Sequence, residues 1–177
     1  MKIALNCDHA SVDLEPAYDV EPWHDFMVAS VGAAAALTGL LFVALSINVD
    51  EIIHLVRLPG RAATTLGMLL TLMASGMVVL APAQGDLLLG IELAILGCAI
   101  GAFAARSMRP RRQPGDAFQV TVLPLILMLV PSVALIVGGV SLAAGVGGGL
   151  YWTLIGFVLG VGATVTNAWV LLVEIKR

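Results

Sequence analysis

The sequence is poor in charge. Only 12% of its 177 residues are Asp, Glu, Lys or Arg, while 59% are hydrophobic and the mean hydropathy is +1.00. Soluble domains carry about twice this share of charged residues. Its 12 acidic and 9 basic side chains are too few to cover an 18.4 kDa globule that faces water on every side. The composition therefore excludes a water-soluble domain and predicts that most of the chain faces lipid.

A basic footprint is also missing. The net charge is -3 and the isoelectric point is near 5.5, whereas nucleic-acid-binding domains gather Lys and Arg on one face. The few arginines lie in short segments between apolar runs. We expect the lipid bilayer as the main surroundings and no nucleic-acid partner.

Catalytic patterns are absent. All three histidines, His9, His24 and His54, fall outside the long apolar runs, so a buried serine has no general base within reach. Glu92 is the single acid inside a run and cannot form an aspartyl dyad by itself. The metal-ligand types near the N-terminus, Cys7 among them, lack a zinc spacing. We expect no enzyme, no cofactor and no metal site.

Long apolar runs are what the sequence has in abundance. A helix that crosses the hydrocarbon core needs about 20 largely apolar residues, and the runs predict five such spans, at about 26–49, 62–84, 87–105, 118–142 and 150–173. The last two share one charge-free stretch, which we divide at the glycine-rich segment 143–149. Continuous runs without alternation argue against a β-barrel. The predicted fold class is an all-α, polytopic integral membrane protein with five transmembrane helices.

Basic residues predict the orientation of these spans. Eight of the nine fall on one side, at Arg57 and Arg61, in the segment 106–112, and at the C-terminus. Loops that face the cytoplasm are enriched in Lys and Arg, so we expect an external N-terminus and a cytoplasmic C-terminus. Residues 1–22 hold five acidic residues and are predicted to form an acidic external tail ahead of a transmembrane domain over 23–177.

Small residues recur every three or four positions in three spans, which lets helix backbones approach closely in lipid. They are Gly32, Ala36 and Gly39 in the first span, Gly90, Ala94, Gly97 and Gly101 in the third, and Gly156 and Gly160 in the fifth. Two interpretations stay open: packing within the bundle, or contact between identical subunits. Cys98, in the middle of the third span, is expected to be a small buried hydrophobic residue.

Glu92 is the most informative polar residue. It lies about 8 Å inside the third span by helical rise, where a bare carboxylate is costly. One interpretation is a carboxylate that lines a cavity or cation pathway, or that takes up and releases a proton, with Asn167 as a further polar residue of the pathway. The other is a glutamate near enough to the interface to reach external water or a neighbouring helix.

Two further features have both a functional and a structural interpretation. Pro124 and Pro131 are predicted to bend the fourth span, either freeing carbonyls toward a hydrated cavity or giving a purely structural kink. The segment 48–61 resembles a short amphipathic helix on the inner surface. There His54, with Asp50 four residues before it, is either a pH sensor or part of a solvated connector.

Part of the chain resembles a known group. The residues Trp23-His24-Asp25-Phe26, the run from Gly32 to Asn48, and Leu58-Pro59-Gly60-Arg61-Ala62 are similar to a group of small bacterial membrane proteins without an established activity. Some members are labelled modulators of the FtsH membrane protease. The resemblance implies a location in the bacterial plasma membrane and supplies no catalytic residues.

Two functions fit these observations. The first is a homo-oligomeric channel or small-solute or ion pathway, in which Glu92, Asn167 and the bend at Pro124 and Pro131 border a water-filled route. The second is a non-catalytic accessory or regulatory subunit that docks on a larger membrane complex, such as a membrane protease. The expected partner is accordingly either a second copy of the chain or another membrane protein.

Overall fold

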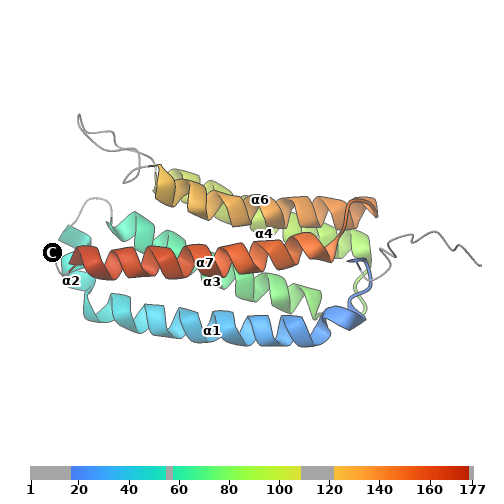
Figure 1. Cartoon of the computed structure of the whole chain (residues 1–177), viewed down its shortest axis with the longest axis horizontal. Helices are drawn as coiled ribbons and strands as arrows, with labels where there is room; N and C mark the ends of the chain where they lie inside the picture. The colour runs from blue at the N-terminus through green and yellow to red at the C-terminus, as the bar shows by residue number, and fades with distance from the viewer. Residues whose placement is uncertain (1–16, 55–57, 109–121, 176–177) are drawn as a thin grey trace, which may run out of the picture.

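The computed structural model describes residues 17–54, 58–108 and 122–175, and all regular secondary structure in these ranges is helical. These ranges contain five long helices and two short ones, arranged as Figure 1 shows. In chain order they are η2 (Glu21–Trp23), α1 (His24–Ile47), α2 (Val49–His54), α3 (Leu58–Val79), α4 (Asp86–Ser107), α6 (Leu123–Ala144) and α7 (Leu150–Ile175).

The five long helices are of membrane-spanning size. They contain 22 to 26 residues, or about 33–39 Å at 1.5 Å per residue, against a hydrocarbon core of about 30 Å. Each is apolar enough to cross a bilayer. The expected all-helical fold with five candidate spans is therefore confirmed in the described residues, and the chain has the architecture of a multi-pass membrane protein.

The helices form one bundle around α3. Helix α3 packs against α1, α4 and α7, whereas α6 packs mainly against α4 and α7. Figure 1 shows α1 along one side of the bundle and the α4/α6 pair along the other. We call the end that carries η2, the loop 80–85 and the turn 145–149 the glycine-turn end, and the opposite end, where α3 begins, the Arg61 end.

Helices α4 and α6 approach each other closely along their backbones. A Cβ atom added at Gly90 would lie 2.5 Å from the carbonyl oxygen of Gly139 and 2.6 Å from the amide nitrogen of Ala143. A Cβ at Gly97 would meet the carbonyl oxygen of Ser132 at 2.9 Å. The small residues of the third predicted span are thus used inside the bundle, where dispersion contacts and close approach hold helices together in lipid.

Gly156 and Gly160 of α7 pack against neighbouring helices, whereas Gly32 and Gly39 of α1 do not. A Cβ at Gly156 would meet Leu135, and one at Gly160 would meet Leu72 at 2.9 Å, so this stripe also packs internally. Gly32 and Gly39 on α1 have nothing within 4 Å of an added Cβ. Of the three predicted stripes, only the one on α1 remains uncovered.

Two spans begin elsewhere than expected. Helix α3 starts at Leu58 rather than 62 and so includes Arg61, and it stops at Val79 because the loop after it turns at Ala83, whose φ is +61°. Helix α6 starts at Leu123 rather than 118. Pro124 therefore lies in the first turn, where a missing N–H breaks no helical hydrogen bond.

This position corrects the predicted double bend of the fourth span. Pro124 lies in the first turn of α6 instead of bending the helix. Only Pro131 lies inside the helix, where it is buried. Helix α6 then ends at Ala144, and Gly145 takes the left-handed conformation (φ +65°) that closes a helix C-terminus.

The last residues of the segment assigned to the tail, 17–22, pack against the bundle. Ala17 is fully buried, the Tyr18 hydroxyl accepts a hydrogen bond from the Gly148 amide at 3.0 Å, and the ring of Trp23 packs edge-on against Tyr151 with centroids 5.0 Å apart. Residues 17–23 thus cover the glycine turn. Residues 1–16 lie outside the described ranges.

A smaller expectation, that Cys98 is buried, is also corrected. Cys98 is exposed on the outer face of α4, because the buried face of that helix is occupied by residues such as Leu93, Gly97 and Ile100. In α2 only Ile52 is buried, while Val49 and Ile53 are exposed. The apolar side of this short helix is therefore only partly covered by the protein.

Candidate functional site

Glu92 is held by a residue from a loop. It lies on α4, six positions after the helix begins, and its Oε2 accepts a hydrogen bond of 3.0 Å from the Nε2 of Gln84. Glu92 and Gln84 are both half-buried. The oxygen of the same amide, Gln84 Oε1, is buried without a hydrogen-bond partner among the described residues. A carboxylate and an unsatisfied carbonyl oxygen therefore belong to the same contact.

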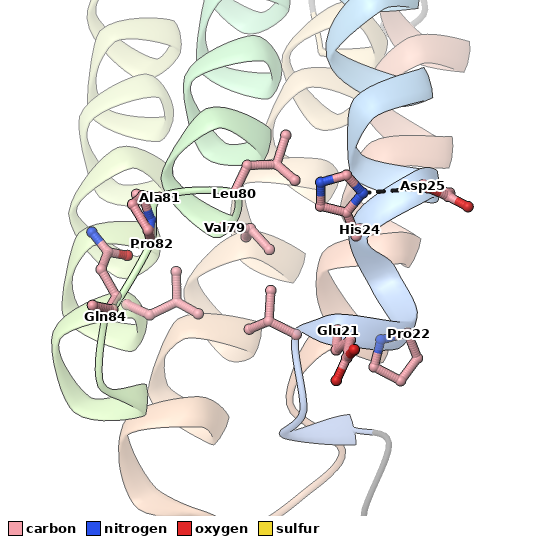
Figure 2. Close-up of a pocket in the computed structure, with 12 residues that line it drawn as sticks. Glu21, Pro22, His24, Asp25, Val79, Leu80, Ala81, Pro82 and Gln84 are labelled. Carbon is pink, nitrogen blue, oxygen red and sulfur yellow. Dashed lines mark hydrogen bonds and ion pairs between the residues drawn. The ribbon is translucent and has the colours of Figure 1, made fainter.

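A pocket of about 720 Å³ lies beside this contact. It is walled by the start of α1 and by the end of α3 with its loop, including His24, Leu80 and Gln84. Figure 2 shows His24 and Gln84 on opposite sides of it and Asp25 directed away from it, with His24 Nδ1 3.3 Å from Asp25 Oδ1. The polar groups of the wall do not converge on one point.

A second polar cluster lies at the Arg61 end. The Arg61 guanidinium donates from Nε (3.2 Å) and Nη2 (2.8 Å) to Oδ1 of Asn167, and Asn167 Nδ2 donates to the hydroxyl of Thr65. Arg61 is 9% exposed and Asn167 is 2% exposed. The cluster joins the first turn of α3 to the second half of α7, and it satisfies the polar atoms that lipid could not satisfy.

The structure does not bring the predicted pathway residues together. Helices α4 and α7 both begin at the glycine-turn end, and Asn167 lies 11 positions further along its helix than Glu92 does along its own. This places Asn167 roughly 16 Å deeper. Fully buried apolar side chains, Leu72, Leu93 and Leu135 among them, occupy the core of the bundle. Glu92 and Asn167 therefore lie at different levels of the bundle and belong to separate polar clusters.

The predicted pH-sensing pair is solvent-facing. Asp50 and His54 both lie on α2 and both are exposed. No hydrogen bond or ion pair joins them in the part of the chain that the structure describes.

Helix α1 carries the most distinctive uncovered surface. Met27, Ala34 and Leu41 repeat every seven positions and are buried. The opposite face is exposed and has a 4-3-4-3-4-3 spacing; we call it the α1 stripe, and it consists of Asp25, Ala29, Gly32, Ala36, Gly39, Val43 and Ser46. Such spacing keeps one face of a helix turned toward a partner helix along its length.

Larger side chains flank the α1 stripe. Leu40 and Phe42 are 71% and 60% exposed, and at 100° per residue they lie about 80° to either side of Gly32. The stripe is thus a shallow strip of small residues between bulky ones. Only 11% of the most apolar window of this helix is buried, against 39–50% in the other four.

Arg61 is the site residue that the sequence analysis missed, because it was assigned to a loop. A signal existed: a basic residue directly before an apolar run, and an amide at the same predicted depth in the last span, suggest a contact between two helix ends.

No protein-family model, no curated protein and no solved structure matches this chain.

Proposed function

We propose that the protein is a membrane protein that works as a homo-oligomer and is joined to a second copy through the α1 stripe. The observation that carries this proposal is the contrast among its small-residue stripes. Those of α4 and α7 are filled by neighbouring helices, while Gly32 and Gly39 meet nothing. In lipid, close backbone approach at small residues is a main source of helix association.

We favour a second copy of the chain as the partner of the α1 stripe, because the buried face and the exposed face of α1 both follow a seven-residue period. Two parallel helices pack along such a period with a small left-handed crossing angle. Identical chains share one orientation in the membrane, so two α1 helices meet in parallel. Their stripes are then in register, and Gly32 and Gly39 of one helix face the same positions of the other.

The setting we propose is the bacterial plasma membrane, with the glycine-turn end outside and the Arg61 end in the cytoplasm. The distribution of basic residues supports this orientation, and the resemblance of the segments within 23–62 supports the location. Under this proposal the protein acts through association rather than catalysis.

A matched pair of variants tests the interface. Ala36 lies on the α1 stripe and Ala33 lies 100° away from Gly32, and both are exposed. Ala36→Leu places a branched side chain between the two helices, and we expect it to weaken self-association at least tenfold, or about 1.4 kcal/mol. Ala33→Leu makes the same chemical change facing lipid and should leave association unchanged. Energy transfer between labelled copies in liposomes measures both.

Cysteine crosslinking identifies the occupant. In a background without native cysteines, Gly39→Cys should crosslink to a homodimer in membranes, and Leu40→Cys should not. A monomer, or a crosslink to a chain of different mass, would contradict self-association. The second of these outcomes would favour an accessory subunit of a larger membrane complex.

A second candidate function is a pathway for an ion or small solute that runs between subunits. The observation that favours it is the half-buried carboxylate of Glu92 within the apolar part of α4, between Asp86 in the first turn and Arg106 in the last. Since the interior of the bundle is packed, such a route depends on the assembly. Flux into liposomes should then fall with Ala36→Leu and stay unchanged with Ala33→Leu.

A further inference from the structure

The contact between Gln84 and Glu92 is incomplete in a specific way. Gln84 Nε2 donates to Glu92 Oε2 at 3.0 Å, while Gln84 Oε1 is buried and has no partner among the described residues. An amide presents its donor and its acceptor side by side. A carboxylate, by contrast, offers only acceptors. Gln84 Nε2 therefore has an acceptor, whereas Gln84 Oε1 has no hydrogen-bond donor among the described residues.

We propose that Glu92 and Gln84 form a proton-binding site of the membrane domain. When Glu92 takes a proton from water at the glycine-turn end, its carboxyl group gains an O–H that donates to Gln84 Oε1. Gln84 Nε2 continues to donate to the carboxyl C=O. The two side chains then make the paired hydrogen bonds of a carboxylic acid and a primary amide. The proton supplies the donor that the buried oxygen lacks.

A proton suits this site better than a metal ion. The contact offers oxygens from two side chains, whereas calcium takes six to eight oxygen ligands and magnesium requires an octahedron. Within the described ranges, no group of three or more His, Cys, Asp and Glu side chains could hold a metal ion. The proposal does not depend on the α1 stripe, because Glu92 and Gln84 lie on α4 and its loop.

Other charged groups are few around Glu92. Asp86 lies on α4 itself, and Glu21, His24 and Asp25 belong to the far wall of the pocket next to Gln84. The described side chains of α6 include no ionisable group, and α3 contributes only Arg61, at the other end of the bundle. The described parts of α3 and α6 thus place no basic side chain beside Glu92.

The backbone directs Gln84 to this contact. The residue before it, Ala83, has a φ of +61°, a left-handed conformation that L-residues other than Gly, Asn and Asp rarely adopt. This reverses the chain between Pro82 and the start of α4. The loop thus places Gln84 just before α4, the helix that carries Glu92.

Infrared difference spectroscopy of the full chain in lipid nanodiscs tests the proposal. Between about pH 9 and pH 4, we expect the carbonyl stretching band of a hydrogen-bonded carboxylic acid to appear reversibly. Glu92→Gln should abolish this band, while Glu92→Asp should retain a carboxylic-acid band. Asp86→Asn should leave the band in place. Gln84→Leu should move it to higher frequency, because the acid loses its amide acceptor.

Three outcomes would overturn the proposal. The first is the absence of any band that depends on Glu92, and the second is a band whose frequency is the same in Gln84→Leu. The third is a titration midpoint that moves with sodium concentration at constant ionic strength, which would make a sodium ion the occupant. Circular dichroism of each variant confirms that the helices are intact before the spectra are compared.

Discussion

At the scale of the residue, Asn167 supplies a hydrogen-bond acceptor for the buried guanidinium of Arg61. Its Oδ1 accepts both hydrogen bonds that Arg61 donates to it, and its Nδ2 donates to Thr65. All three side chains are buried. Removing a buried partner costs more than the hydrogen bond itself contributes, because the remaining group stays desolvated.

Asn167→Leu should therefore destabilise the protein by about 2 kcal/mol or more, since it takes a shared acceptor from a charged donor. Thr166→Leu is the control, because Thr166 is the exposed neighbour and bonds only the Gly162 carbonyl of its own helix. Reversible unfolding in mixed detergent micelles measures both. Equal stability of the two variants would refute the structural role of Asn167.

The polar residues inside the bundle differ in how clearly the sequence reveals them. Glu92 and Asn167 stand out in the sequence because each is polar within an apolar run. Arg61 does not stand out in the sequence, because a prediction from hydropathy places a charged residue that precedes an apolar run outside the helix. Whether such a residue lies outside the helix or inside the bundle depends on a partner 106 positions away in the chain.

At the scale of the element, the pair α4/α6 depends on glycine. A Cβ on Gly90 would meet backbone atoms of α6, which cannot move as the end of a side chain can. Gly90→Ala should thus push the two helices apart at a cost of about 1–3 kcal/mol. Gly162→Ala, on α7, meets open space and should be neutral or stabilising by up to about 1 kcal/mol. Thermal unfolding in detergent compares the two, and a loss of stability at both positions would contradict this packing.

The same elements show why helix positions are more predictable than helix partners. The length and hydropathy of each run lead to five helices, with ends within about five residues of those observed. Three spans carry the same small-residue spacing, yet two are covered inside the bundle and one is not. Spacing describes a face, and only the neighbouring helices decide whether that face is occupied.

At the scale of the whole molecule, orientation is the testable property. The basic residues lie mainly at the Arg61 end or in segments that join helices there, and such residues favour the cytoplasmic side. An alkaline phosphatase fused after Arg177 should therefore be inactive in cells. A cytoplasmic reporter at the same position should be active. A fusion at residue 85, in the loop at the glycine-turn end, should show the opposite pattern. An active phosphatase after Arg177 would reverse the proposed topology.

The composition alone determines that this chain belongs in lipid, because water cannot solvate so continuous an apolar surface and unpaired backbone groups require helices there. Local chain chemistry also favours the turn at Gly145 and a helix start at Leu123, directly before Pro124. Only the tertiary structure decided that Arg61 meets Asn167, that Gln84 reaches Glu92, and that the α1 stripe stays uncovered. These are contacts between segments distant in the sequence or on different elements, and their free energy depends on which groups share a buried space, which no single run of residues specifies.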